Sequence, residues 1–407
     1  MLEVKSVSEV FQIIRENFSS YEVGGEFLDI GAAAGRITVA EVMAPEDVPG
    51  FSRSSVDGYA VFASDIFGAS DTMPAQLELV GEVVMGEKPA FSLKKGQTAY
   101  VPTGGELPGN VDAMVMVEYT EDFQDGFIYI NKSASPGNSV VFRGDDAACG
   151  SVIIGSDRLL RPQDIGALAA IGYGQVRVKS RIKVGIISTG DELVEISEKP
   201  NGAKVRDVNS HALCSAVLNL GGEPVLYGII SDDFLKLSEV AMRAVKECDI
   251  VLISGGSSAG TKDETRNVID SLGSPGVLAH GIAVKPGKPT ILGNVNGKAV
   301  FGLPGHPASA LMIFRIFVGY LFDVIYKVEG HFFNSVGAVM ECNYPSNNGR
   351  EEFLPVRLKQ SGVENIAAPV FGKSGLLSLL TAADGYVHIS RGSEGLTMGQ
   401  KVEVILF

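Results

Sequence analysis

The chain has 407 residues, of which 45% are hydrophobic and 49 are glycines, and its formal net charge is −14. A chain of this length and composition is expected to form roughly two to four globular domains. The acidic balance excludes a general nucleic-acid or anionic-membrane surface, because such surfaces are basic. The cysteines, Cys149, Cys214, Cys248 and Cys342, have no CxxC spacing, which indicates reduced thiols in a cytosolic protein instead of a zinc site or a disulfide framework.

Residues 1–18 (MLEVKSVSEVFQIIRENF) carry charges throughout, so we expect an amphipathic helix and not a signal peptide. Residues 45–145 are interrupted by prolines and glycines and contain short apolar runs such as DAMVMVEY and GFIYIN, a pattern typical of a β-rich module. Two stretches of it are rich in turn residues: PGFSRSSVDGYAV at 49–61 and VPTGGELPGNVDAMVMVE at 101–118. From the residue types alone, Asp57-Gly58 and residues 102–105 are turns.

Residues 181–328 alternate short apolar runs with amphipathic segments. The runs KVGIIS, EPVLYGII and DIVLISGG are continuous, which predicts buried strands, and NSHALCSAVLNLGG and FLKLSEVAMRAVKEC have helical spacing. This order predicts a mostly parallel sheet covered by helices, with ligands bound at the carboxyl ends of the strands.

Polar, glycine-rich sequences follow these predicted strands. STGDEL comes after KVGII, and SGGSSAGTKDE, which includes Ser254, Gly255, Gly256 and Ser258, comes after DIVLI. Such a loop is suited to hold a phosphate on its backbone N–H groups and hydroxyls. The alternative is a flexible connection to a helix whose capping box is Thr261 and Glu264.

Four carboxylates, Asp191, Glu192, Asp232 and Asp263, fall at or just beyond the same strand ends. Carboxylates beside a phosphate are typical of a magnesium site. The alternative is a solvated acidic rim, which an acidic protein supplies readily.

A stiff segment occupies residues 285–307, KPGKPTILGNVNGKAVFGLPGHP. Asn296-Gly297 between two apolar runs predicts a hairpin that pairs residues 290–293 with 298–301 and places KPGKP beside GLPGHP. Either lysine alone could be an ordinary surface residue, but the position of Lys285 and Lys288 on this turn beside GLPGHP favours an anion clamp. His306, between two prolines, is more often a structural residue than a ligand-binding one.

The next segment, residues 308–326, is apolar and nearly long enough to cross a membrane. Arg315 and Asp323 interrupt it, which favours a buried helix. From about residue 329 the runs FLPVRLKQ, GYVHIS and KVEVILF indicate a small sheet or barrel.

Eight motifs in order along the chain together resemble the molybdopterin molybdenumtransferase family, to which the C-terminal domain of gephyrin is related. They are PGFSRSSVDGYAV, PTGGELPGNVDAMVMVE, FRGDD, STGDEL, GIISDD, SGGSSAG, KPGKP and GLPGHP. The resemblance runs almost end to end. It implies a multidomain α/β plus β fold with an elongated linking region at 1–44 and 146–180, an inserted β-rich domain at 45–145, a molybdopterin-binding three-layer α/β domain at 181–328 and a C-terminal β-barrel at 329–407.

The resemblance also implies an activity and an assembly. Family members convert adenylylated molybdopterin and molybdate into molybdenum cofactor and AMP with a divalent metal, here expected to be Mg²⁺. The resemblance implies that this chain forms a cytoplasmic homodimer in which Asp57 and Thr103 of one subunit act in the cleft of its partner. It also implies that molybdopterin adenylyltransferase supplies the substrate. Neither nucleic acid nor membrane is an expected partner.

Matching motif positions assigns roles to individual residues. The catalytic positions are Asp57, Thr103, Asp146, Glu192, Asp232 and Asp263, with Glu192, Asp232 and Asp263 as metal candidates. The substrate-binding positions are Ser254, Gly255, Gly256, Ser258, Lys285, Lys288, Pro304, His306 and Pro307.

Three positions depart from the family pattern: Val56 replaces a frequent methionine, His306 a frequent asparagine, and Gly281 a lysine of some members. They leave open the choice between molybdate and tungstate. Two other functions remain as alternatives, a gephyrin-like scaffold and a nucleotide pyrophosphatase on the same α/β domain.

Overall fold

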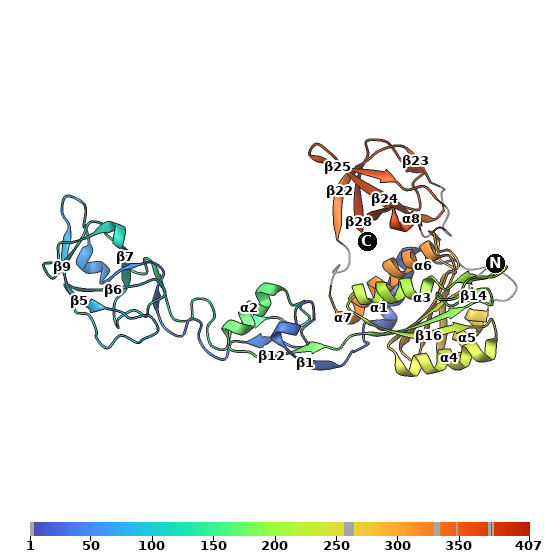
Figure 1. The fold of residues 1–407 in the computed structure, drawn as a ribbon, viewed down its shortest axis with the longest axis horizontal. Coiled ribbons are helices and arrows are strands. Elements are labelled where there is room, and N and C mark those ends of the chain that lie inside the picture. The colour runs from blue at the N-terminus through green and yellow to red at the C-terminus, as the bar shows by residue number, and fades with distance from the viewer. Residues whose placement is uncertain (1–3, 256–263, 329–333, 347–348, 373–375, 377) are drawn as a thin grey trace. The chain divides into compact units, whose positions relative to one another are not determined.

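The computed structural model of the chain describes residues 4–255, 264–328, 334–346, 349–372, 376 and 378–407. Contacts between residues divide the chain into two compact units (Figure 1). The first comprises the chain up to residue 26, residues 35–37 and everything from residue 177 onward, and the second comprises residues 27–34 and 38–176. The ribbon β1–β12 (Gly25–Asp29 with Gln175–Lys179) lies where the chain passes between them.

The second unit is built on a six-stranded sheet, which agrees with the β-rich module expected from the sequence. Its order is β7-β4-β6-β5-β9-β8, formed by Ala113–Met116, Gly58–Val61, Gln97–Val101, Ala75–Glu82, Phe127–Ile130 and Thr120–Asp122. Both faces are covered, because neighbouring residues such as Ala60 and Val61 belong to two different apolar clusters. The smaller elements are β2 (Val42–Met43) with β11 (Val152–Ile154), β3 (Arg53–Ser54) with β10 (Val140–Val141), α2 (Pro162–Ala170), η1 (Ile30–Ala32), η2 (Ala63–Ile66) and η3 (Val117–Tyr119).

The first unit contains the expected α/β sheet, in the order β16-β13-β17-β21-β20-β18. The strands are Glu223–Ile230, Lys183–Thr189, Ile250–Ser254, Lys298–Leu303, Ile291–Val295 and Pro275–His280. The first four are parallel to one another, β20 runs antiparallel to β21, and β18 runs antiparallel to β20. The predicted strands KVGIIS, EPVLYGII and DIVLIS are therefore confirmed as strands. β13 and β17 are buried, as their continuous apolar runs predict, but the expectation of a buried strand is wrong for β16, which lies at the edge of the sheet and is only partly covered.

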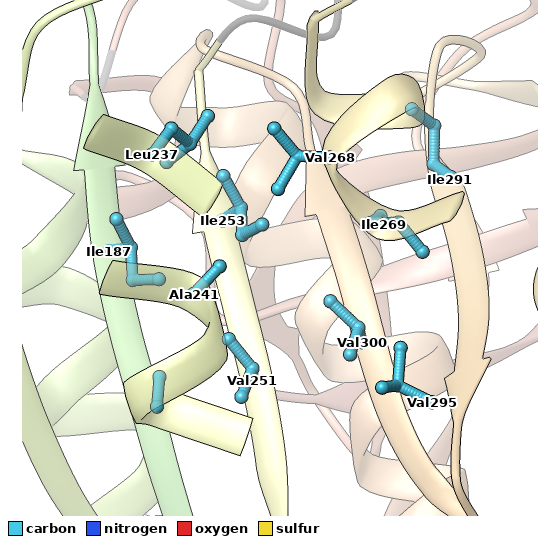
Figure 2. Close-up of a cluster of buried hydrophobic side chains, with 11 residues drawn as sticks. Ile187, Leu237, Ala241, Val251, Ile253, Val268, Ile269, Ile291, Val295 and Val300 are labelled. Atoms are coloured by element: carbon cyan, nitrogen blue, oxygen red, sulfur yellow. The ribbon is translucent and has the colours of Figure 1, made fainter. Parts of the chain in front are cut away.

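Helices cover both faces of this sheet (Figure 1). On one face lie α4 (Phe234–Glu247) and α5 (Glu264–Leu272), whose apolar side chains meet those of the strands (Figure 2). The cluster comprises Ile187, Leu237, Ala241, Ala244, Val251, Ile253, Val268, Ile269, Ile291, Val295 and Val300. The other helices of the unit are α1 (Val7–Phe18), α3 (Asn209–Asn219), α6 (Pro307–Ile313), the π-helical turn η4 (Phe314–Val318) and α7 (Gly319–Tyr326).

The N-terminal segment forms α1, as its charge pattern predicts. Ser6 and Glu9 close a capping box, in which the Ser6 hydroxyl accepts from the Glu9 N–H at 3.2 Å and the Glu9 carboxylate accepts from the Ser6 N–H at 2.7 Å. The helix packs on α7, with the ring of Phe11 4.4 Å from that of Tyr320. An amphipathic helix thus becomes part of the α/β unit.

Residues 307–326 form one apolar helical stretch inside the same unit. It is long and apolar enough to cross a membrane, but 78% of its apolar window is buried within the protein. Arg315, which interrupts the stretch, donates to the carbonyl of Leu406 at 3.0 Å. The burial confirms the prediction of a core helix.

The C-terminal region forms the predicted barrel. The sheet order β24-β25-β22-β28-β26 closes on itself because β24 also pairs with β26. Its strands are Glu351–Ser361, Glu364–Pro369, Ser335–Met340, Lys401–Leu406 and Gly385–Ile389, and β19 (Val284–Lys285) adds to β24. The unit is completed by β14 (Leu193–Val194) with β15 (Val205–Arg206), β23 (Tyr344–Pro345) with β27 (Gly395–Leu396), and α8 (Ser378–Thr381).

Candidate functional site

The parallel strands of the α/β sheet end side by side. Ser188 on β13 is in register with Ser254 on β17, and Ser254 is in register with Leu303 on β21. The polar sequences that follow these strands therefore meet at one edge, as the sequence predicts.

A pocket of about 440 Å³ opens at this edge. We call it the strand-end pocket, and its lining residues are Ser188, Thr189, Glu192, Leu193, Val205, Arg206, Asp207, Val208, Asn209, Ser254, Gly255, Gly305, His306 and Pro307. Five of the residues assigned by the family resemblance belong to it: Glu192, Ser254, Gly255, His306 and Pro307. Hydroxyls, a guanidinium and a glycine-rich turn together suit a phosphate-bearing ligand.

Gly255 is required by the shape of this turn. Its φ is +111°, and a Cβ at this position would lie 2.0 Å from the carbonyl oxygen of Thr189. The backbone after β17 therefore passes directly against the end of β13, which only glycine permits. The predicted residues Gly256, Ser258 and Asp263 lie outside the described residues.

Asn209 joins two walls of the pocket, a role that the sequence analysis missed. Its side-chain amide donates to the Ser254 hydroxyl at 2.8 Å and to the Gly305 carbonyl at 2.9 Å. Within the described part of the chain its Oδ1 atom and the Ser188 hydroxyl are buried without a hydrogen-bond partner. The available signal was the polar pair Asp207 and Asn209 at the start of α3.

Asp207 is the second residue that was missed. Its side chain lines the pocket, is only 4% exposed, and accepts from the backbone N–H of Ser210 at 3.1 Å. A carboxylate buried at the start of a helix satisfies a free N–H and is favoured by the helix dipole. Asp207 therefore orders the wall from which Asn209 reaches across.

Three of the expected carboxylates, Asp191, Glu192 and Asp232, lie at the strand ends. Glu192 lines the strand-end pocket. The carboxylate of Asp232 accepts from the Thr189 hydroxyl at 2.8 Å, and its backbone N–H donates to Asp191 at 3.3 Å. In the described ranges no group of three or more His, Cys, Asp or Glu side chains is placed to hold a metal ion. Magnesium usually keeps several waters and uses one or two carboxylates with substrate phosphates, and carboxylates such as these fit that arrangement.

A second pocket of about 810 Å³ lies beside the KPGKP turn. We call it the lysine pocket, and its lining residues are Val284, Lys285, Pro286, Gly287, Lys288, Pro289, Pro304, His306, Ala308, Ser309, Met312, Tyr344, Arg350, Glu352, Phe353, Leu354, Pro355, Val370, Phe371, Gly372, Leu379 and Leu380. Lys285, Lys288 and Pro304 are thus brought together, as the resemblance implies. His306 lines both pockets, so the two adjoin at this residue.

The hairpin that builds the lysine pocket is the one predicted from Asn296-Gly297. Strands β20 and β21 pair antiparallel with Val295 opposite Lys298. Asn296 and Gly297 have φ values of +53° and +88°, as a two-residue hairpin turn requires. The hairpin returns the chain to its start, which is why KPGKP and GLPGHP line one pocket.

Lys285 has a partner that the sequence analysis did not foresee. Its ammonium lies 2.7 Å from the carboxylate of Glu352, a barrel residue that is only 4% exposed. In the part of the chain that the structure describes, Lys288 has no ion-pair partner. The two lysines of the predicted clamp therefore differ in their charge environment.

Asp57 and Thr103 lie together in the second unit. The backbone N–H and the hydroxyl of Thr103 donate to Asp57 Oδ1 at 2.7 and 3.0 Å. The backbone bond first, and the hydroxyl bond after it, hold the pKa of Asp57 below its usual value. Asp146 is exposed in the same unit, where its backbone N–H donates to the Val48 carbonyl at 3.0 Å.

Comparisons with known families agree with this architecture along the whole chain. Residues 5–172 match the family model "MoeA N-terminal region (domain I and II)". Residues 185–323 match "Probable molybdopterin binding domain", and residues 337–407 match "MoeA C-terminal region (domain IV)". The fold and the site therefore define a multidomain protein of molybdenum cofactor biosynthesis.

Individual relatives narrow this class further. The chain is 34% identical to the molybdopterin molybdenumtransferase of Nostoc sp. over 75% of this chain and 70% of that protein. It is 28% identical to the enzyme of the same name from Bacillus subtilis over 100% and 95% of the two chains. The crystal structure of the molybdopterin biosynthesis MoeA protein from Pyrococcus horikoshii OT3 matches with a TM-score of 0.87 and 31% identity, over 100% of both chains. The chain belongs to the molybdopterin molybdenumtransferase family, which confirms the resemblance read from its motifs, and it is a transferase of molybdenum cofactor biosynthesis.

Proposed function

We propose that this transferase inserts molybdate into adenylylated molybdopterin and releases AMP. The observation that carries the proposal is the meeting of two chemically different pockets at His306. The strand-end pocket has the glycine turn and hydroxyls that suit a phosphate-bearing substrate, and the lysine pocket has the cations that suit an oxyanion. Water cleaves the phosphoanhydride to give AMP and molybdopterin. The two dithiolene thiols pass their protons to one oxygen of molybdate, which leaves as water as both sulfurs bind the molybdenum.

A divalent metal, which we propose to be Mg²⁺, assists by neutralising the pyrophosphate. Glu192 and Asp232 would each supply one carboxylate oxygen, with water and phosphate oxygens completing the shell. Asp263 stays a candidate for the same role on the ground of its motif position. Tungstate in place of molybdate belongs to the same proposal, because the two oxyanions share charge and shape.

The proposed assembly is a cytoplasmic homodimer with a shared site. Asp57 and Thr103 of one subunit, with Asp146, would complete the cleft of the other. Molybdopterin adenylyltransferase would supply the adenylylated substrate, and no nucleic acid or membrane takes part.

The proposal is tested by reconstitution. Purified protein is incubated with adenylylated molybdopterin, Mg²⁺ and molybdate, and AMP and active cofactor are measured. We expect both products, and we expect each to depend on molybdate. AMP release without any oxyanion would favour the pyrophosphatase, and binding without turnover would favour the scaffold.

The metal is tested in the same assay. Chelation by EDTA should abolish AMP release, and added Mg²⁺ should restore it. Turnover that survives chelation and dialysis would contradict the proposed role of the cation.

A further inference from the structure

The lysine pocket contains a carboxylate where an oxyanion site would be expected to have none. Glu352 is the acidic side chain among the residues that line it, beside Lys285, Lys288 and Arg350. It is 4% exposed, forms an ion pair with the Lys285 ammonium at 2.7 Å, and accepts hydrogen bonds from the Tyr344 hydroxyl at 2.7 Å and the Ser346 hydroxyl at 2.6 Å. Both of its oxygens are therefore held in place.

The backbone fixes this pair as firmly as the side chains do. β19 adds to the barrel as a parallel strand, with Lys285 in register with Glu352. Side chains alternate along a strand, so the preceding residue, Glu351, points to the other face and pairs with His388 at 2.7 Å. The barrel thus presents one carboxylate to the lysine pocket and directs its neighbour away.

The pair has a consequence for anion binding. The carboxylate of the pair is buried, whereas the Lys285 side chain is 47% exposed, so the ammonium keeps part of its contact with water. The carboxylate also repels any bound anion and offsets part of the attraction that Lys285 exerts on it. Net positive charge in the pocket therefore comes from Lys288 and Arg350.

We propose that Glu352 is a positioning residue for the transfer reaction. It holds the Lys285 ammonium in one place and offsets its charge, so that the pocket orients an oxyanion without retaining it tightly. Binding the ground state and the transition state equally tightly would not accelerate the reaction. A cation held in a fixed position accelerates it if it stabilises negative charge that develops in the transition state. The inference rests on the proposed function, in which the lysine pocket receives the oxyanion.

The test is Glu352→Gln, which keeps the shape and removes the charge. Molybdate binding is measured by isothermal titration calorimetry, and kcat and the KM for molybdate are measured in the AMP-release assay. We expect the Kd for molybdate to fall by at least about threefold and kcat to fall by about tenfold. If Glu352 had a purely structural role, Glu352→Gln would lower the melting temperature or weaken molybdate binding. The proposal is overturned if Glu352→Gln does not bind molybdate more tightly than the wild type.

Glu351→Gln is the matched control, because it removes the same charge one residue away on the other face of β24. It should leave the Kd for molybdate and kcat within about twofold of the wild type. An equal tightening in Glu351→Gln would show a general charge effect and would also overturn the proposal.

Lys285→Arg tests the positioning separately and does not need the glutamate variant to fold. The charge is kept, but the planar guanidinium presents its donors differently from an ammonium. We expect molybdate to bind within about twofold of the wild type while kcat falls at least about tenfold. An unchanged kcat would contradict the requirement for a fixed ammonium.

Failure of this inference is distinguishable from failure of the proposed function. If the wild type neither binds molybdate nor releases AMP, the proposed function falls and the inference with it. If the wild type does both and Glu352→Gln behaves like it, only the inference falls.

Discussion

Asn209 shows how one side chain can order a pocket without belonging to a recognisable motif. Its amide donates to Ser254 on the β17 end and to Gly305 before α6, so it ties together the two turns that flank the strand-end pocket. The residue is therefore expected to matter for binding more than for folding.

Asn209→Ala should raise the KM for adenylylated molybdopterin by up to about thirtyfold, because two hydrogen bonds worth about 1 kcal/mol each are lost. The measurement is steady-state AMP release, with the melting temperature followed by calorimetry. Asn219→Ala, at the other end of α3 and exposed, is the control and should leave KM unchanged. A normal KM in Asn209→Ala would show that the two turns hold their positions without the amide.

Asp57 allows a second test at single-residue resolution. Bonds from Thr103 favour its charged form and lower its pKa, so they persist at neutral pH and are lost only as the pH falls through that lowered value. We expect the Asp57 carboxylate, followed by carbon-13 NMR, to titrate below the usual aspartate range. In Thr103→Ala the hydroxyl bond is absent and the backbone bond remains, so the pKa should rise part of the way back. Titration at the usual value in the wild type would contradict the observed bonds.

At the scale of elements, the β20–β21 hairpin illustrates how local chemistry builds the lysine pocket. Its turn needs two residues with positive φ, and asparagine and glycine are the two types that adopt this conformation most readily. The turn lies at the opposite end of the hairpin from KPGKP and GLPGHP. Changes in the turn should therefore affect stability and leave the pocket chemistry intact.

Gly297→Ala should lower the free energy of unfolding by about 1 to 2 kcal/mol, because an added Cβ disfavours the left-handed backbone. The space around it is open, with no atom within 4 Å of that Cβ, so no clash adds to the cost. The measurement is the unfolding transition in urea, together with the KM for molybdate, which should not change. The paired control is Asn296→Gly, which keeps a residue suited to φ +53° and should be nearly neutral. A raised KM in Gly297→Ala would mean that the turn also shapes the pocket.

At the scale of the whole molecule, the proposed homodimer can be tested by combining two differently altered subunits. If a cleft combines Lys285 of one subunit with Asp57 of the other, a dimer of an Asp57→Ala subunit and a Lys285→Ala subunit has one intact cleft and one doubly altered cleft. We expect such heterodimers, isolated with two different affinity tags, to recover up to about half of wild-type AMP release. Each altered homodimer should be nearly inactive, because every one of its clefts carries a lesion.

The control for this experiment places both changes in the same subunit and pairs it with a wild-type subunit. Each cleft then carries one lesion, so this heterodimer should be nearly inactive, although the number of altered residues is the same. Equal activity of the two arrangements would argue against a site shared between subunits.

Much of this protein was predictable from its sequence because the relevant signals are local. Continuous apolar runs predicted β13, β16 and β17, and helical spacing predicted α3 and α4. Asn296-Gly297 predicted a hairpin and hence the joining of KPGKP with GLPGHP. The Asp57 and Thr103 motifs were assigned through the family resemblance, and the structure places the two residues in contact.

What only the tertiary structure decided are the partners that come from distant parts of the chain. Nothing near Lys285 in the sequence indicates Glu352, because their pairing depends on β19 joining the barrel edge at β24. Asn209 has its role because the fold brings the first residue of α3 within hydrogen-bond distance of Ser254 and Gly305. Likewise, the apolar 307–326 segment has the composition of a membrane span, and only its packing inside the α/β unit makes it a core helix. Sequence patterns report the preferences of a segment for burial and backbone shape, whereas the pairing of individual polar groups depends on where the folded chain brings them.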